Sequence, residues 1–273
     1  MSGKESVLTE CILKVKEEGR CARIPFVTGG VPDKDSFWDT LAELEENGAD
    51  IIELGVPFSD PVADGPVIAA ASHRALSRGV SLAWLLDGLM ERKYKVPLVI
   101  MSYANPLLQY GWSKANGTSL EEIRDASLEI LAEHLFKAGI KGVIIPDVPL
   151  DEAGPYQKAL AAKDIDLIAL VGPNTSLERM EEYAKTAKGY VYVVSVMGIT
   201  GAREGLPPEA IDTLTRARSV FSLPLALGFG LKEPGQVRGL SSTPDAVIFG
   251  SALVKHLEEG KSAADFMKPW LVG

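Results

Sequence analysis

The sequence is poor in cysteine and histidine. It contains two cysteines, Cys11 and Cys21, without a CxxC pair, and only three histidines among its 273 residues. Two cysteines do not make a disulfide framework, so we expect a reducing compartment, the cytoplasm. The histidines, His73, His134 and His256, lie far apart and lack the spacing of metal ligands. We therefore expect no metal in this chain.

Positive charge is also in deficit. There are 28 lysines and arginines against 37 aspartates and glutamates, which gives a net charge of −9. A chain of this charge repels nucleic-acid phosphates and anionic lipid surfaces, so we expect neither as a partner. A small anionic substrate remains compatible with this charge, because backbone N–H groups bind phosphate locally.

Long apolar runs and several catalytic motifs are missing as well. No segment approaches the roughly 18 apolar residues that a membrane-spanning helix needs. The first segment, MSGKESVLTECILKVKEEG, is charged throughout and lacks the apolar stretch of a signal peptide. The sequence contains no GxSxG and no GxxxxGK[ST], which argues against a serine hydrolase and a P-loop enzyme. We also find no lysine in the apolar segments, which disfavours a Schiff-base aldolase.

Short apolar segments recur along the chain, each followed by a charged segment typical of a helix. The apolar segments are residues 22–29, 50–57, 97–103, 142–149, 166–172, 190–196, 224–230 and 246–252. They are rich in Val, Ile and Leu with little polar alternation, which is typical of parallel strands buried on both faces. Eight strands alternating with helices predict an α/β fold, a closed (β/α)8 TIM barrel.

Helix signals lie between the apolar segments. The clearest amphipathic segments are residues 35–48, 176–189 and 207–221. Ser176 is a predicted N-cap, and Gly48 and Gly189 are predicted helix ends. We find no linker, so we predict a single domain covering residues 1–273, with an insertion at 113–127.

Glu53 interrupts the apolar segment 50–57, and Asp64 follows in a loop crowded with proline and glycine. A glutamate near the carboxyl end of a barrel strand lies where such barrels build active sites. Apolar neighbours would raise its pKa toward neutrality, which suits proton transfer. A buried structural carboxylate would have the same pattern, and Asp64 is equally typical of a turn. If the loop folds back over the barrel, the two carboxylates can take different roles.

Glycines cluster after three late segments, in MGITGAREG, GFG and FGSA. Loops after strands 7 and 8 of a TIM barrel, with a short helix, commonly form a phosphate site. Glycine lets backbone N–H groups approach the phosphate, and the helix dipole favours the anion. The candidate donors are Gly201, Gly230, Gly250 and Ser251. The alternative is that these glycines only fit tight turns.

Two tyrosines are further candidates for chemistry. Tyr103 ends one apolar segment, and Tyr192 alternates with apolar residues in YVYVVSV. For Tyr192, a core aromatic residue is an equally good interpretation of the pattern.

The segment ELGVPFSDPVADGPVI, residues 53–68, closely resembles the signature of the tryptophan synthase α chain. The resemblance extends over nearly the whole chain. It includes residues 25–32, 103–111, 144–149, 190–202, 227–230 and 250–254. The resemblance implies a TIM barrel that cleaves indole-3-glycerol phosphate to indole and glyceraldehyde 3-phosphate without a cofactor of its own.

The same resemblance assigns roles to residues. Glu53 and Asp64 match the catalytic carboxylates of the family, and Tyr192 matches a tyrosine of the substrate pocket. Gly201, Gly230, Gly250 and Ser251 match the positions that hold the substrate phosphate. Phe26, Met101 and Phe229 would form the apolar slot for the indole ring.

The resemblance also implies a partner, a tryptophan synthase β chain that contains pyridoxal phosphate (PLP), in an αββα complex. Indole would pass to it through a tunnel. Asp60 and Pro61 match the α/β contact region, and residues 198–207 match a flexible lid. One departure is Val31, where the family usually has an acidic or aromatic residue. Another is the expected insertion.

Three other functions share parts of this pattern. One is a stand-alone lyase that releases free indole, and it would use the same catalytic residues. Another is a catalytically silent barrel that serves as a structural or regulatory partner, which the retained carboxylates and glycines disfavour. The last is a different phosphosugar enzyme of tryptophan or histidine biosynthesis, which would not need SDPVADGP.

Overall fold

The computed structural model describes the chain except for residues 1–4, 195–207, 229–230, 232–233, 238–243 and 272–273. The described strands are β1 (Ala22–Thr28), β2 (Ile52–Gly55), β3 (Leu98–Met101), β4 (Ile140–Ile144), β5 (Asp166–Leu167), β6 (Ala169–Val171), β7 (Val191–Val194), β8 (Leu225–Gly228) and β9 (Ala246–Phe249). Each expected strand segment overlaps an observed strand, and all the pairings between the described strands are parallel. The prediction of a parallel α/β barrel is therefore confirmed.

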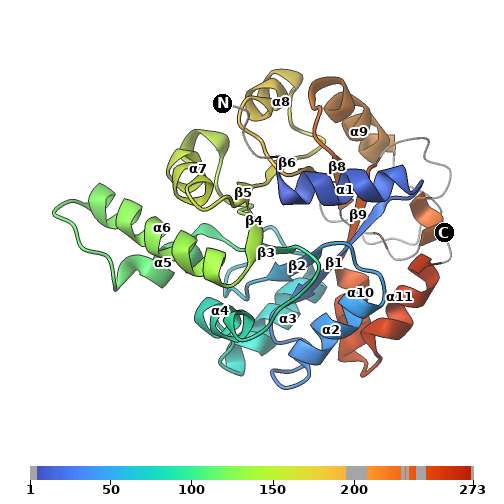
Figure 1. Cartoon of the computed structure of the whole chain (residues 1–273), viewed down its shortest axis with the longest axis horizontal. Coiled ribbons are helices and arrows are strands. Elements are labelled where there is room, and N and C mark those ends of the chain that lie inside the picture. The colour runs from blue at the N-terminus through green and yellow to red at the C-terminus, as the bar shows by residue number, and fades with distance from the viewer. Residues whose placement is uncertain (1–4, 195–207, 229–230, 232–233, 238–243, 272–273) are drawn as a thin grey trace.

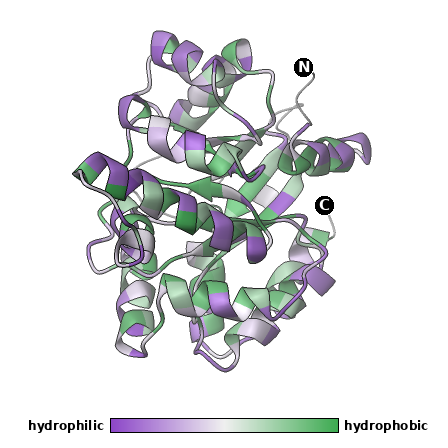
Figure 2. Cartoon of the chain, turned by 60° about the vertical axis from the view of Figure 1, so that its left-hand side comes forward, coloured by the Kyte–Doolittle hydropathy of each residue, from purple (hydrophilic) through white to green (hydrophobic). Residues whose placement is uncertain are grey.

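The helices surround these strands (Figure 1). The first six are α1 (Val7–Glu17), α2 (Phe37–Glu46), α3 (Pro66–Ser77), α4 (Leu82–Met90), α5 (Ala104–Trp112) and α6 (Leu120–Lys137). The others are α7 (Gly154–Ala161), α8 (Leu177–Ala184), α9 (Pro208–Val220), α10 (Ser251–Glu258) and α11 (Ala263–Leu271), with two 3₁₀ turns, η1 (Leu150–Glu152) and η2 (Pro234–Val237). Figure 2 shows the apolar residues gathered on the strands and inner helix faces, with polar residues outside.

The fifth expected strand is divided in the structure. The sheet order is β5-β4-β3-β2-β1-β9-β8-β7-β6, so its two edges are β5 and β6. Only Ile168 separates these strands, and its N–H donates to the Val143 carbonyl at 2.9 Å. Segment 166–171 thus pairs with β4 at its start and with β7 at its end, which brings the sheet round into a barrel.

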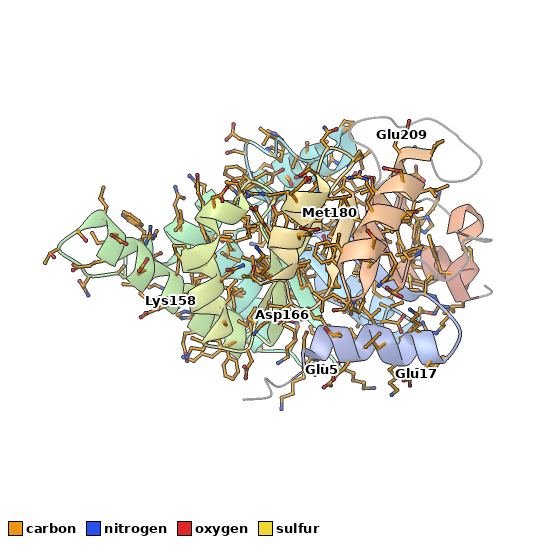
Figure 3. The ribbon with its side chains drawn as sticks, turned by 90° about the horizontal axis from the view of Figure 1, so that it is seen from above. Glu5, Glu17, Lys158, Asp166, Met180 and Glu209 are labelled. Atoms are coloured by element: carbon orange, nitrogen blue, oxygen red, sulfur yellow. The ribbon has the colours of Figure 1, made fainter. Side chains whose placement is uncertain are left out.

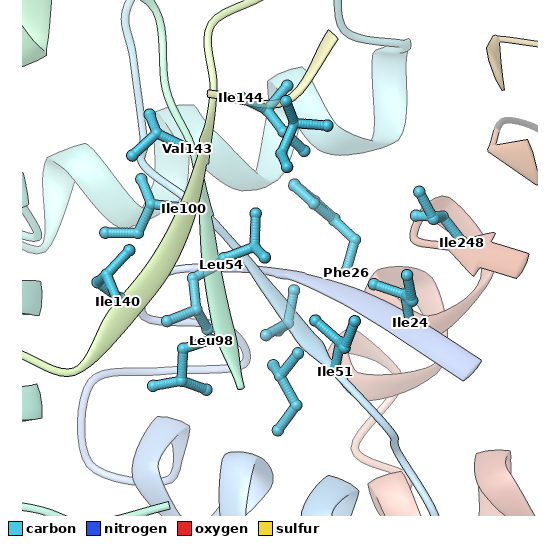
Figure 4. Close-up of a cluster of buried hydrophobic side chains, with 14 of the residues drawn as sticks. Ile24, Phe26, Ile51, Leu54, Leu98, Ile100, Ile140, Val143, Ile144 and Ile248 are labelled. Atoms are coloured by element: carbon cyan, nitrogen blue, oxygen red, sulfur yellow. The ribbon is translucent and has the colours of Figure 1, made fainter. Parts of the chain in front are cut away.

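The barrel interior is apolar for most of its length. The main buried cluster contains Ile24, Ile51 and Ile248, among many others (Figure 4). A second cluster packs β7 and β8 against α8 and α9. Because most of the strands bury both their inward and their outward side chains, they are fixed in register, which positions residues at their carboxyl ends.

Some expected boundaries are wrong. Strand β4 begins at Ile140, so Lys141 lies inside a strand, contrary to our expectation that no strand contains lysine. It lies at the amino-terminal end of β4, away from the end where TIM-barrel sites form. Ser176 caps α8 as predicted, accepting from the Arg179 N–H at 3.2 Å. The helix ends at Ala184, before Gly189, because a turn at residues 185–186 precedes that glycine.

The expected insertion, 113–127, corresponds to the turn between α5 and α6 and the first part of α6. The two helices extend away from the barrel side by side (Figure 1). They cross closely at Gly111, where a Cβ would collide with the Ser127 carbonyl oxygen. The Ser127 hydroxyl donates to the Leu108 carbonyl at 2.6 Å. That this segment is an insertion in a single domain stays a prediction.

Helix α1 covers the amino-terminal end of the barrel. Leu8 lies against Gly142, where a Cβ would come within 2.8 Å of its Cδ1. The Thr9 hydroxyl donates to the Gly189 carbonyl at 2.6 Å, and Ser6 bonds to Asp166, whose place beside the start of α1 is visible in Figure 3. Asp245, which precedes β9, accepts from Lys16 of α1 at 2.6 Å.

Asp245 is buried and links α1 to the amino-terminal end of the barrel. Its side chain is 1% exposed, and it also bonds Arg218 and accepts from the Leu225 N–H at 2.8 Å. Replacing Asp245 with Ala should lower the free energy of unfolding by about 2 kcal/mol, because the buried Leu225 N–H loses its acceptor and the two basic side chains bound to Asp245 lose a charged partner. Urea denaturation measures this loss. Asp265→Ala removes an exposed pair with Lys268 and should change stability little. Equal effects of the two changes would contradict the role of Asp245.

Candidate active site at the carboxyl ends of the strands

Glu53 lies within β2 with its side chain in the barrel. It is paired in register with Phe26 of β1 and Val99 of β3, and none of its surface is exposed. Neither carboxylate oxygen has a hydrogen-bond partner among the described residues. Burial, and then the nearby charge of Asp64, raise the pKa of Glu53 to about 8. The carboxyl group is therefore mostly protonated at neutral pH.

Asp64 lies in the loop between β2 and α3, just before the helix begins at Pro66. Its N–H donates to the Pro61 carbonyl at 3.0 Å, which folds the loop back. Burial raises the pKa of Asp64 to about 6, and a hydrogen bond from the Tyr103 hydroxyl, at 3.2 Å, opposes that rise. At neutral pH, Asp64 is thus mainly ionised and Glu53 is mainly protonated. The structure brings the two predicted carboxylates together and gives them different charges.

Tyr103 is bound to the Asp64 loop. Besides donating to Asp64, its hydroxyl accepts from the Ala63 N–H at 2.9 Å. Its ring stacks on Phe58 at 5.1 Å between centroids. The sequence marked Tyr103 as a candidate without a partner, since nothing in the local pattern links residue 103 to residue 64.

Two tyrosines line the barrel beside the carboxylates. Tyr192 lies against Gly228 of β8, where any Cβ would collide with its ring. Tyr190, two residues earlier, is fully buried, and its hydroxyl has no partner among the described residues. Burial and the charge of Glu53 raise the pKa of both phenols well above the ordinary value. Sequence analysis did not single out Tyr190, although its alternation with Tyr192 in YVYVV was a usable signal.

Phe26 and Met101 lie at the same end of the barrel. The Phe26 ring packs over Gly55 of β2 and Gly250 after β9, because neither glycine has a side chain to block it. Met101 is half-buried and pairs in register with Gly55. An apolar surface therefore adjoins the two carboxylates.

Gly250 and Ser251 lie where β9 passes into α10. Gly250 is the N-cap, and the helix begins at Ser251, which is exposed. A helix N-terminus at a strand end favours an anion. The other predicted pocket residues, Gly201, Phe229 and Gly230, lie outside the described residues. So does the predicted lid, 198–207.

The described part of the chain holds no group of three His, Cys, Asp or Glu side chains placed to bind a metal ion. His134 and His256 bond to main-chain carbonyls, at 2.7 and 3.0 Å. None of the helices that the structure describes is long and apolar enough to cross a bilayer.

Comparisons with known proteins agree with this geometry. The tryptophan synthase alpha chain family model matches residues 12–268. The tryptophan synthase alpha chain of Nitratidesulfovibrio vulgaris is 56% identical, over 97% of this chain and 98% of that protein. That of Desulfovibrio desulfuricans is also 56% identical, over 97% and 99%.

Solved structures give the same result. One structure of Mycobacterium tuberculosis tryptophan synthase superposes with a TM-score of 0.84 and 32% identity, covering 97% of this chain and 96% of that one. The tryptophan synthase subunit alpha of Legionella pneumophila superposes with a TM-score of 0.80 and 28% identity, covering 97% and 95%. With the family model matching nearly its full length, the chain belongs to the tryptophan synthase alpha chain family.

Proposed function

We propose that this chain cleaves indole-3-glycerol phosphate to indole and glyceraldehyde 3-phosphate, as a carbon–carbon lyase. The observation that carries the proposal is the pair of unlike carboxyl groups. Glu53 is buried and protonated at neutral pH, and Asp64 beside it is mainly ionised. A retro-aldol cleavage of this substrate needs both a proton donor and a negative charge near the ring.

Glu53 supplies the proton. The reaction begins when its carboxyl proton passes to indole C3, which leaves a positive charge on the ring and a carboxylate at Glu53. That carboxylate then removes the proton of the hydroxyl on the carbon joined to indole C3. The C–C bond breaks, its electrons restore neutral indole, and the oxygen becomes the aldehyde of glyceraldehyde 3-phosphate. Glu53 ends protonated, so one group acts as acid and then as base.

Asp64 stabilises the charged ring. It accepts a hydrogen bond from the indole N1–H, and its negative charge offsets the positive charge that develops when C3 is protonated. Such stabilisation is strongest in a site shielded from water. The apolar surroundings of Glu53 support this assignment, because they raise the pKa of the proton donor and strengthen the interaction with the ring.

The remaining pocket residues hold the two ends of the substrate. We assign the indole ring to the slot formed by Phe26, Met101, Tyr192 and Phe229. The phosphate is assigned to the backbone around Gly201, Gly230, Gly250 and Ser251. The start of α10 at Ser251 supports the phosphate assignment, since its unpaired N–H groups suit an anion.

The proposal includes a partner. Some solved structures that resemble this chain are titled as tryptophan synthase, which supports pairing with a β chain in an α2β2 complex. In that complex the β chain would hold PLP and convert indole to L-tryptophan, while this chain would hold no cofactor. We place the reaction in the cytoplasm, because the two cysteines are free thiols.

Glu53→Gln should lower kcat for indole release from indole-3-glycerol phosphate by at least about a hundredfold, with folding preserved, because general acid–base catalysis supplies that much. Asp64→Asn should lower kcat by at least about a hundredfold as well, because it removes the negative charge that stabilises the protonated ring. Indole release is measured with and without a cognate β chain. Slow release that β stimulates strongly supports the α subunit, and fast release independent of β indicates a stand-alone lyase. Near-normal turnover by Glu53→Gln would overturn the mechanism.

The pH dependence of kcat/KM should be bell-shaped. Asp64 must be ionised, so activity should rise as the pH rises through about 6. Glu53 must be protonated at the start, so activity should fall as the pH rises through about 8. Asp64→Asn should lose the acid limb of whatever activity remains. A profile that is flat from pH 5 to pH 9 would contradict the assignment of charges.

Glu53 should also make stability depend on pH. Its pKa is 4.5 ordinarily and about 8 in the fold, so the chain takes up a proton on folding between these values. Its contribution to stability is full below 4.5 and is lost as the pH rises toward 8. The side chain that Glu53→Gln introduces does not titrate. The free energy of unfolding of this variant, relative to that of the wild type, should therefore increase as the pH rises, by up to about 1.4 kcal/mol per pH unit across this window.

Urea denaturation of the wild type and Glu53→Gln at pH 5, 6.5 and 8 measures this advantage. Glu129→Gln, an exposed change on α6, is the matched control and should show no such trend. A constant difference between wild type and Glu53→Gln at all three pH values would show that Glu53 titrates alike in the folded and unfolded chain.

A further inference from the structure

We propose that Tyr103 is a positioning residue that holds the β2–α3 loop in place and keeps Asp64 ionised opposite Glu53. Its role in turnover rests on the function proposed above. Tyr103 reaches Asp64 from the β3–α5 junction, where it is the N-cap of α5, so Asp64 depends on that junction as well as on its own loop.

Tyr103 contacts the loop at both of its ends. Phe58, near the start, stacks on the phenol ring with the planes 30° apart. At the far end, the Ala63 N–H donates to the phenol oxygen at 2.9 Å, and that hydroxyl bonds to Asp64 Oδ2 at 3.2 Å. One side chain therefore contacts both ends of the span 58–64, whose last member is the carboxylate.

The backbone on either side of Tyr103 is itself held. The Ser102 N–H donates to the Ile144 carbonyl of β4 at 3.0 Å, and the Ala104 N–H donates to Asp147 at 2.9 Å. The Ser102 hydroxyl donates to the Tyr103 carbonyl at 3.1 Å. Tyr103 is only 3% exposed. A ring fixed in this way transmits the position of β3 to the Asp64 loop, because neither its backbone nor its side chain is free to move.

The direction of the hydrogen bond follows from the chemistry of a phenol. The hydroxyl has one proton, and its oxygen already accepts from Ala63, so the proton is directed to Asp64. Burial, and then the charge of Asp64, raise the pKa of Tyr103 far above neutrality, so it remains a donor throughout the working range. A donor of this kind favours the ionised form of Asp64.

The other groups around Asp64 do not stabilise its charge. Glu53 faces it from β2, and Tyr192 faces it from β7; Asp64 raises the pKa of both. Asp60 lies in the same loop, and Asp147, after β4, acts on Tyr103. None of these side chains is a cation. Among the described residues, the Tyr103 hydroxyl is therefore the side-chain donor that offsets the cost of burying the Asp64 charge.

Tyr103→Phe tests this role, since it keeps the ring and its stacking on Phe58 and removes only the hydroxyl. Tyr110→Phe is the matched control, because Tyr110 lies on α5 and packs its ring edge against His134. Indole release by each full-length chain, with its β chain, is measured from pH 5.5 to pH 8.5. Thermal unfolding establishes that both variants are folded.

The acid limb of kcat/KM should move up by about one pH unit in Tyr103→Phe, which is the usual worth of a hydrogen bond to a charged group. The loss of kcat/KM should be about fivefold at pH 6 and should shrink toward pH 8, where Asp64 is ionised in both proteins. Tyr110→Phe should leave the profile unchanged. A loss of equal size at every pH, or no loss, would overturn the proposal.

A second measurement does not depend on turnover. The ¹³C carboxyl signal of Asp64, assigned by its absence from Asp64→Asn, is titrated in the wild type and in Tyr103→Phe without substrate. The midpoint should rise in Tyr103→Phe, and an unchanged midpoint would overturn the proposal. If the wild type released no indole, the proposed function would fail, while this titration would still decide the role of Tyr103.

Discussion

The burial of Glu53 is the constraint on which the other features of the site depend. A carboxyl group without a hydrogen-bond partner is costly inside a protein and avoids much of that cost by staying protonated. The barrel imposes this environment, because β2 lies between β1 and β3 and every residue of it is buried. Asp64 contributes as well, since its charge makes ionisation of Glu53 still less favourable. The burial that makes Glu53 unfavourable for stability is also what keeps its carboxyl group protonated at neutral pH.

The aromatic rings beside Glu53 occupy space left by glycines in, or just after, neighbouring strands. Gly55 and Gly250 leave room for the Phe26 ring, and Gly228 leaves room for Tyr192. A side chain at any of these positions would push an aromatic ring out of place. The positions of the Phe26 and Tyr192 rings are thus determined by the glycines that they pack against. The same rigid packing that raises the pKa of Glu53 also defines the apolar surface next to it.

Much of the fold could be predicted from sequence because parallel buried strands have a strong apolar pattern, and Glu53 was visible as an exception to that pattern. The division of segment 166–171 at Ile168 was not visible, since it arises from pairing with two different neighbours. The end of α8 at Ala184 was missed because a turn can precede a glycine. The Tyr103–Asp64 bond was beyond reach for a similar reason, as it joins residues far apart in sequence.

The buried and half-buried acids at the two ends of the barrel differ in the hydrogen-bond donors that they meet. At the amino-terminal end, Asp245 bonds to Lys16 and Arg218, and Asp50 binds Arg20 through two hydrogen bonds at 2.7 and 2.9 Å. Those carboxylates meet strong donors, as charges that only stabilise a fold should. Glu53 has no such donor in the described part of the chain, and Asp64 accepts one side-chain hydrogen bond there, from the Tyr103 phenol. A fold selected for stability alone would satisfy or remove both groups, so the unmet hydrogen-bonding capacity points to a substrate that supplies the missing partners.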